Sequence, residues 1–143
     1  MARKLTYKGQ KARTWKAFSV YIRLRDADNL GVCRCCTCDF RAWWGAGHLI
    51  NAGHAIPGRG NAVLFDETLV AAQCVKCNLD GGGQQYKFIK FLKKKYGWDD
   101  AVIEEKLNLR YAVKKYTVEE LREMEEFFKG ESVRIAKEKG LII

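Results

Sequence analysis

Apolar side chains recur at helical spacing in the first part of the chain. Trp15, Phe18 and Ile22 are three and four residues apart, so they would share one face of a helix. Residues that favour turns follow, from Asp26 to Gly31. The pattern predicts an amphipathic helix from about residue 14 to about residue 25.

The second half of the chain returns to helical spacing. Apolar residues alternate with lysines over residues 86–96, and Gly97 follows as a stop signal. Asp99 and Asp100 are suited to cap a further short helix, which we expect to end near Leu107.

A capping box opens the last predicted helix. Thr117 and Glu120 have the residue types and spacing of this motif, and the helix should continue to about Lys139. Its apolar stripe is expected to contain Leu121, Met124, Phe127 and Phe128.

Between residues 32 and 85 the helical spacing disappears and glycines are frequent. Trp43-Trp44 and Leu49-Ile50 are suited to short strands on either side of a Gly-Ala-Gly turn. Neither a sequence repeat nor a Pro-rich or Ser-rich linker divides the chain. The pattern therefore predicts a single domain of mixed helices and short strands.

The chain is strongly basic. Its 143 residues include 26 Lys and Arg against 17 Asp and Glu, a formal net charge of +9. Such a charge is typical of polyanion-binding proteins, with nucleic acid as the default partner, although ribosome-associated and peripheral membrane proteins share it. Residues 1–13 contain five basic residues and no acidic one, and we expect a basic arm there.

A membrane location is not expected. The apolar stretches are shorter than the roughly 20 residues that a membrane helix needs, and the N-terminus lacks the apolar region of a secretory signal. We therefore expect a cytoplasmic protein. In a reducing compartment, clustered cysteines point to metal binding rather than to disulfides.

Six cysteines occur, and they include two C-x-x-C pairs: Cys35 with Cys38, and Cys74 with Cys77. Four thiolates from two such pairs can hold one structural zinc ion in a closed tetrahedral site. Cys33 and Cys36 have the same spacing as the first pair. Spacing alone does not choose between these two first pairs.

His48 and His54 are the two histidines of the chain. A histidine taken alone is more often structural than catalytic, which is the expectation for His48. His54 follows Gly53 and lies between the two C-x-x-C pairs. An imidazole titrates near neutral pH, so it can take a proton from water while a divalent ion polarises a phosphate. His54 is therefore a candidate general base.

Several distinctive motifs follow one another over roughly residues 15–97. They are Ile22-Arg23-Leu24-Arg25-Asp26-Ala27-Asp28, Cys35-Cys36-Thr37-Cys38, Ala52-Gly53-His54, Leu64-Phe65-Asp66-Glu67, Gln73-Cys74 and Cys77-Asn78. In order and spacing they resemble the bacteriophage NinG/Rap recombination endonuclease family.

The resemblance implies an α+β fold with an HNH-like ββα-metal core, stapled by a structural zinc knuckle pair and flanked by N-terminal and C-terminal helices. The core would span residues 14–97, and a helical extension would span residues 98–143. The distance of the first knuckle from the Arg-Leu-Arg-Asp segment in the family favours Cys35 over Cys33. The implied zinc ligands are Cys35, Cys38, Cys74 and Cys77.

The resemblance also implies a Mg²⁺- or Mn²⁺-dependent endonuclease that cleaves branched DNA, such as a Holliday junction or a D-loop, in the cytoplasm of an infected bacterium. His54 would be the general base, and Asp66 and Asn78 would be catalytic residues that bind the divalent ion. Symmetric junction cleavage would favour a homodimer. The basic side chains expected to contact DNA are Arg23, Arg25, Arg59, Lys87, Lys90, Lys93 and Lys94.

One segment departs from the family. Relatives carry Asn-Val-His before the second knuckle, where this chain has Leu69-Val70-Ala71. The Asn amide of an HNH site helps to orient the general base, and leucine has no amide. The Leu69 carbonyl, His48 or Asn61 would have to substitute for it. The alternative function is therefore a catalytically weakened or dead DNA-junction-binding protein or regulator, whereas a zinc-ribbon RNA-binding protein would leave the other motifs unexplained.

Overall fold

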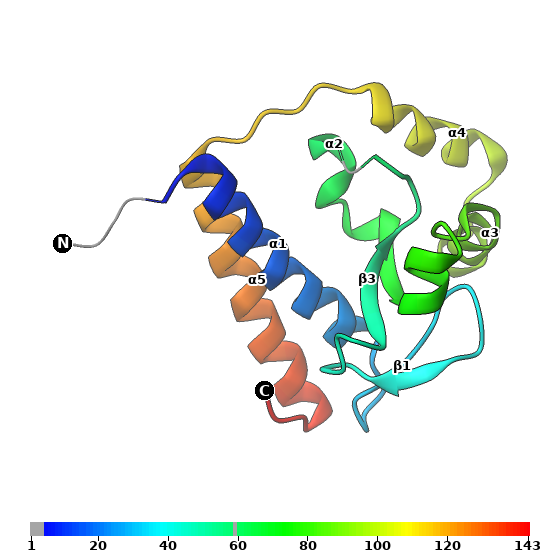
Figure 1. Ribbon diagram of the computed structural model, residues 1–143, viewed down its shortest axis with the longest axis horizontal. Helices are drawn as coiled ribbons and strands as arrows, with labels where there is room; N and C mark the ends of the chain where they lie inside the picture. The colour runs from blue at the N-terminus through cyan, green and yellow to red at the C-terminus, as the bar shows by residue number, and fades with distance from the viewer. Residues whose placement is uncertain (1–4, 59) are drawn as a thin grey trace.

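The computed structural model describes residues 5–58 and 60–143. Figure 1 shows two long helices, α1 and α5, side by side, with the strands and the shorter helices to one side of them. The elements are α1 (Tyr7–Asp26), β1 (Val32–Arg34), β2 (Arg41–Trp43), β3 (Ile50–His54), α2 (Asn61–Leu64), η1 (Glu67–Leu69), β4 (Val70–Cys74), η2 (Lys76–Asp80), α3 (Gln85–Tyr96), α4 (Asp100–Asn108), η3 (Leu109–Tyr111) and α5 (Val118–Lys139). In the described part of the chain, every helix is too short or too polar to cross a membrane.

Helix α1 begins earlier than its apolar spacing predicted. Thr6 caps the helix by accepting a hydrogen bond from the Gly9 amide at 3.0 Å, and the first helical residue is Tyr7. Residues 7–13 are therefore helical, and the expectation of a basic arm over residues 1–13 was wrong for them. Residues 1–4 lie outside the described part of the chain.

The early turns of α1 are held by buried polar contacts with α5. The Thr14 hydroxyl donates to the Leu121 carbonyl at 2.7 Å, and Gln10 Nε2 donates to Glu125 Oε1 at 2.8 Å. At the other end, Lys139 Nζ donates to the Leu24 carbonyl at 2.7 Å, so the two helices run in the same direction. Apolar spacing did not reveal these turns because the buried side chains there are polar.

Glu125 is the most buried acidic side chain of this interface, at 6% exposure, and it also pairs with Lys129 at 2.8 Å. Burial would raise the pKa of Glu125, but hydrogen bonds from Lys129 and Gln10 lower it below its usual range. We expect Glu125→Ala to lower the free energy of unfolding by about 2 kcal/mol, because it removes a buried charged acceptor and leaves Gln10 only its longer hydrogen bond to the Thr14 hydroxyl, at 3.3 Å.

Urea unfolding of the wild type and the variant measures this difference. Glu126→Ala, at the neighbouring exposed position, is the matched control and should change the free energy of unfolding by less than about 0.5 kcal/mol. Equal effects of the two substitutions would contradict a structural role for the Glu125 contacts.

The strands form two separate antiparallel pairs. In the first, β1 pairs with β2, with Val32 opposite Trp43. In the second, β3 pairs with β4, with Ile50 opposite Cys74. The strands expected near Trp43 and Ile50 exist, but they lie in different sheets and do not flank one hairpin turn. All five residues of β4 are buried, so its backbone groups need the partner that β3 provides.

The helices of the second half confirm the sequence prediction. Helix α3 ends at Gly97, whose φ of 68° is left-handed and favours glycine. The Asp99 side chain caps α4 by accepting from the Val102 amide at 3.0 Å. Thr117 and Glu120 form the expected capping box of α5. Each of these end signals is local, which explains why the sequence revealed them.

The apolar stripe of α5 differs in one position from the expectation. Leu121 and Phe128 are buried and Met124 is partly buried, but Phe127 is 57% exposed. The stripe packs against Phe18 and Ile22 of α1 in the same chain. The stripe therefore forms part of the core of this chain.

The β3–β4 pair lies between two apolar clusters. On one side Val70 and Ala52 pack with Phe18 of α1. On the other side Ala71 packs with Phe88 of α3. Alternate residues of a strand point to opposite faces, so each side chain of β3 and β4 faces either α1 or α3. This alternation decides where the candidate site residues lie.

Candidate functional site

Four cysteine sulfurs meet beside the sheet. Cys35 and Cys38 come from the loop between β1 and β2, Cys74 ends β4, and Cys77 lies in η2. Their Sγ atoms all lie within 4.8 Å of one another. The Cys38 and Cys74 Sγ atoms are 3.7 Å apart, which is close to the ~3.8 Å expected between two sulfurs bound to a tetrahedral zinc at about 2.3 Å. The cluster can therefore hold a metal ion such as zinc.

Backbone amides support these sulfurs. The amides of Thr37, Phe40 and Cys77 lie 3.5, 3.4 and 3.4 Å from the sulfurs of Cys35, Cys38 and Cys74, respectively. Hydrogen bonds to sulfur favour the thiolate that a metal requires. Burial alone would raise the pKa of Cys35, but backbone hydrogen bonds and the Thr37 hydroxyl lower it to about 7.

Cys33 and Cys36 take no part in the cluster. The Cys33 thiol is fully buried and donates to the Arg23 carbonyl at 3.1 Å. Burial raises the pKa of Cys33 to about 12 and raises that of Cys36 as well, so both are neutral thiols. The structure thus confirms Cys35 as a member of the cluster and decides between the two possible first pairs.

A metal in the cluster would tie distant parts of the fold together. The first pair belongs to the β1–β2 loop, and the second pair joins β4 to η2. Four thiolates complete a tetrahedral zinc site, so such an ion has no open position for a reacting water. Its part would be structural, because it would connect the β1–β2 loop, β4 and the segment that leads into α3.

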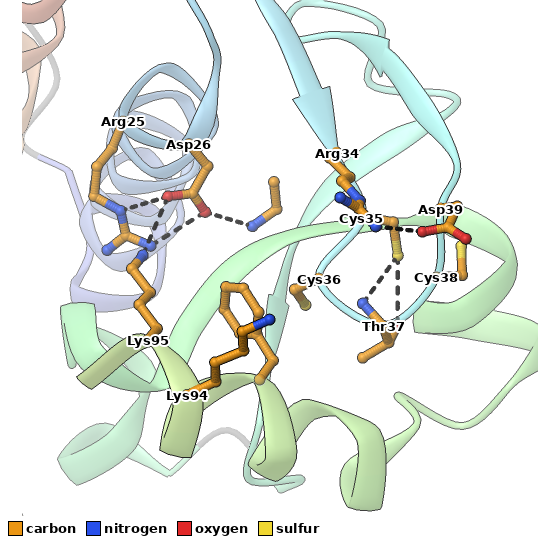
Figure 2. A pocket seen from close by; sticks show the side chains of 12 residues that line it. Arg25, Asp26, Arg34, Cys35, Cys36, Thr37, Cys38, Asp39, Lys94 and Lys95 are labelled. Atoms are coloured by element: carbon orange, nitrogen blue, oxygen red, sulfur yellow. Dashed lines mark hydrogen bonds and ion pairs between the residues drawn. The ribbon is translucent and has the colours of Figure 1, made fainter. Parts of the chain in front are cut away.

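Gln73 is a member of the site to which the sequence assigned no role beyond its place in the Gln73-Cys74 motif. It is fully buried, and its Nε2 donates to the Thr37 hydroxyl at 3.0 Å and to the Gly83 carbonyl at 2.8 Å. Thr37 in turn contacts the Cys35 sulfur at 3.4 Å, a contact that Figure 2 shows. A Cβ at Gly53 would lie 2.2 Å from Gln73 Oε1, so glycine is required there. The sequence signal for a role of Gln73 at the cysteine site was its position directly before the second cysteine pair.

His54 ends β3 on the side that faces α1. Its ring is stacked on Trp15, with ring centroids 5.0 Å apart, and its Nε2 lies 3.2 Å from the Leu64 carbonyl oxygen. A carbonyl only accepts hydrogen bonds, so this contact assigns the proton to Nε2. In the neutral imidazole the basic lone pair is then on Nδ1.

The Leu64 carbonyl contacts the His54 ring, a contact for which the sequence suggested other groups. The Leu69 carbonyl accepts from the Ala55 amide at 2.9 Å, and Asn61 Nδ2 donates to the Lys114 carbonyl at 2.9 Å. His48 lines a pocket beside the second cysteine pair. Each of those three groups has a described partner or place of its own, and their part in orienting His54 stays a prediction.

The two side chains at which the resemblance implies a departure from the family are apolar and buried. Leu69 is 2% exposed and Ala71 is 1% exposed. Both pack in the cluster that contains Phe88 and Leu92 of α3. An apolar core therefore lies where an Asn and a His would place polar groups.

Asp66 caps a short helix. Its Oδ1 accepts from the Thr68 amide at 2.9 Å and from the Thr68 hydroxyl at 2.6 Å. Its Oδ2 lies 3.4 Å from Lys106 Nζ. These contacts give the carboxylate a structural role at the start of η1.

Asn78 lies in the π-helical turn η2, and its Nδ2 donates to Asn51 Oδ1 at 3.3 Å. Asn51 and His54 are three residues apart in β3, so their side chains point to opposite faces. The structure therefore does not bring His54 and Asn78 together. Among the described residues, the four-cysteine cluster is the group of His, Cys, Asp and Glu side chains close enough to hold a metal ion.

Arg25 and Asp26 hold α1 to the sheet. The Arg25 side chain donates to Asp26 Oδ1 and to the carbonyls of Glu67 and Val70, each at 2.8 Å. Asp26 Oδ2 accepts from the Ala72 amide at 2.8 Å. Figure 2 shows the pair beside the first knuckle. Arg25 thus has a structural role, and its expected contact with DNA stays a prediction.

The other expected DNA contacts vary in their surroundings. Arg23 donates to the Trp44 carbonyl at 2.7 Å and has a structural role like that of Arg25. Arg59 lies outside the described residues. In α3, Lys93 pairs with Asp100 at 2.6 Å, whereas Lys87, Lys90 and Lys94 are exposed.

Comparison with protein families gives one result for nearly the whole chain. The model of the bacteriophage lambda NinG protein matches residues 2–138. Comparison with curated proteins and with solved structures yields no match. The matched range includes α1, both cysteine pairs, His54 and almost all of α5. The chain therefore belongs to the bacteriophage lambda NinG protein family.

Proposed function

We propose that this protein acts in phage recombination as a divalent-metal-dependent endonuclease on branched DNA, with His54 as the general base. The observation that carries the proposal is the position of His54. It ends β3 between the two cysteine pairs, and its Nε2 is held by the Leu64 carbonyl. This contact orients the imidazole without the amide that Leu69 lacks.

The arrangement of elements supports an HNH-like core. The antiparallel strands β3 and β4 are joined through α2 and η1, and β4 is followed by η2 and then by α3, with the cysteine cluster where β4 meets η2. Two strands and a helix in this order form the ββα-metal unit of our proposal. The +9 net charge is suited to a polyanionic substrate.

The chemistry assigned to His54 is proton removal. With the proton on Nε2, Nδ1 can accept a proton from the water that attacks the phosphodiester. The Leu64 carbonyl stabilises the imidazolium that forms, because it accepts a hydrogen bond from the charged ring. Trp15 limits rotation of the ring by stacking on it.

The divalent ion that the proposed reaction needs would take oxygen ligands such as Asp66 and Asn78. These two side chains have separate partners, Thr68 for Asp66 and Asn51 for Asn78, and do not form a common ligand set. They do not fit such an ion in this arrangement. No step of the proposed reaction is therefore assigned to the ion, and the cleavage assay tests whether a divalent ion is required.

A second candidate function is a DNA-junction-binding protein that has lost cleavage. The buried apolar pair Leu69 and Ala71 favours it, because the family resemblance implies Asn and His at these positions. This candidate retains the zinc-binding cluster and the basic surface. It predicts junction binding with no products.

One cleavage assay distinguishes the nuclease from the junction-binding protein. Purified protein is incubated with a labelled four-way junction and with a linear duplex of the same sequence, each with Mg²⁺, with Mn²⁺ or with neither. We expect cleavage of the junction only when a divalent ion is added, and weaker cleavage of the duplex. Binding without products under all three conditions would reject the nuclease and support the junction-binding protein. Absence of both binding and cleavage would reject both candidates.

A further inference from the structure

An open pocket of about 900 Å³ lies between the first cysteine pair, the end of α1 and α3. Figure 2 shows Arg34 on the knuckle side and Lys94 and Lys95 on the α3 side. We propose that this pocket binds a phosphate group of a DNA strand, with Arg34 and Lys94 as its main contacts. The inference rests on the DNA-binding part of the proposed function and locates a contact site for it.

Lys94 is the cation of this pocket that is most available. Its side chain is exposed, and no described residue forms an ion pair with it. Lys95 is more committed, since its Nζ lies 3.7 Å from Asp26 Oδ1 and over the Phe91 ring. Lys94 can therefore bind a phosphate without breaking a described ion pair.

Arg34 is held by a weak and exchangeable partner. It pairs with Asp39 of the same loop, and the two side chains are 62% and 90% exposed. An exposed ion pair contributes little to stability, so a phosphate can replace Asp39 at small cost. The planar guanidinium can then donate two hydrogen bonds to phosphate oxygens.

Asp26 is the shared acidic partner of the two remaining cations of the pocket, Arg25 and Lys95. Arg25 and Asp26 neutralise each other through two hydrogen bonds and face Ala72 and the sheet. Cations from two separate elements, the knuckle loop and α3, then border one hollow. A phosphate between them would connect the zinc-binding loop to α3, which is an arrangement that scattered surface lysines do not offer.

Two simpler explanations exist for the α3 lysines. Lysines in the last turn of a helix offset the negative end of its dipole, and cations near four thiolates offset the negative charge of a zinc–thiolate centre. Both explanations predict that loss of Lys94 changes helix stability or zinc retention and leaves DNA affinity unchanged. Neither requires Arg34 at the opposite side of the pocket.

The test is DNA binding by the double variant Arg34→Gln/Lys94→Gln. Fluorescence anisotropy with a labelled four-way junction, without added Mg²⁺, gives the affinity over a series of salt concentrations. Each lost phosphate contact lowers the slope of log affinity against log salt by roughly 0.7 to 0.9. We expect the slope to fall by about 1.5, with an affinity loss of about tenfold or more at low salt.

The matched control is Arg134→Gln/Lys137→Gln, which removes the same charge from exposed positions on α5. It should change the salt slope much less than the pocket variant. Equal effects of the two double variants would show that only total charge matters and would overturn the inference. Loss of zinc from the pocket variant, measured by metal analysis, would overturn it in favour of a role in the metal centre.

The experiment distinguishes failure of the proposed DNA-binding function from failure of the pocket proposal. If the wild type does not bind the junction at any salt concentration, then the DNA-binding function itself is rejected. If the wild type binds and the pocket variant behaves as the control does, only the pocket is rejected. Should the double variant unfold, Lys94→Gln alone carries the test, with an expected fall in slope of about 0.8.

Discussion

Replacing Cys77 by Ser is expected to release the metal and unfold the part of the chain around the two knuckles. A structural zinc site supplies on the order of 10 to 16 kcal/mol of apparent binding free energy, whereas a domain of this size is stable by about 5 to 15 kcal/mol. Cys77 is one of four sulfurs within 4.8 Å of one another. A hydroxyl is a poor substitute for one of four thiolates, so the loss should approach the whole stability of the protein.

Metal analysis and circular dichroism measure the outcome. Cys36→Ser is the matched control, because Cys36 lies in the same loop as Cys35 and outside the cluster. It should retain about one zinc ion per chain and lose at most about 1 kcal/mol of stability. A Cys77→Ser protein with native metal content and native helicity would refute the zinc centre. Chelation of the wild-type metal should reproduce the effect of the Cys77 variant.

The His54→Ala variant is expected to lose cleavage of a four-way junction by roughly 10² to 10⁴-fold, the range typical of a general base. Junction affinity should remain within about twofold of the wild type, because the substitution does not alter the net basic charge. Single-turnover cleavage with added Mg²⁺ measures the first quantity, and anisotropy without added Mg²⁺ measures the second.

His48→Ala is the control for this variant, since His48 lies in a different pocket beside the second cysteine pair. It should cleave as the wild type does. His54 also stacks on Trp15, so a structural role has to be separated from a chemical one. Added imidazole should partly restore cleavage by His54→Ala if the role is proton transfer, and it should have no effect if the ring only packs. Undiminished cleavage by the variant would remove His54 from the reaction.

Whether the wild type cleaves junctions also bears on the effect of the buried Leu69 and Ala71. If the wild type cleaves junctions, the Leu64 carbonyl is sufficient to orient the imidazole. If it only binds them, the apolar packing of Leu69 and Ala71 against Phe88 is the physical reason. In that case the fold and the basic surface have been kept while the polar groups of the site have been replaced by core.

Local signals in the sequence were sufficient for much of the fold. A cap or a stop depends on a few neighbouring residues, and the ends of α3, α4 and α5 follow Gly97, Asp99 and Thr117 as expected. The start of α1 was missed, because Gln10 is a polar residue whose burial depends on Glu125, more than a hundred residues away. Strand pairing was also missed, because short strands do not reveal their partners.

The sequence by itself determined the basic charge, the helix ends and the presence of two metal-binding cysteine pairs, since these depend on residue type and short spacing. Cysteine spacing alone left two possible first pairs, and the tertiary structure, as the family resemblance implied, brings Cys35 rather than Cys33 to Cys74. It also decided that His54 and Asn51 face opposite sides of β3, and that Arg25 serves the fold. These outcomes depend on which strands pair and on which helix covers each face of the sheet, and spacing along the chain contains neither.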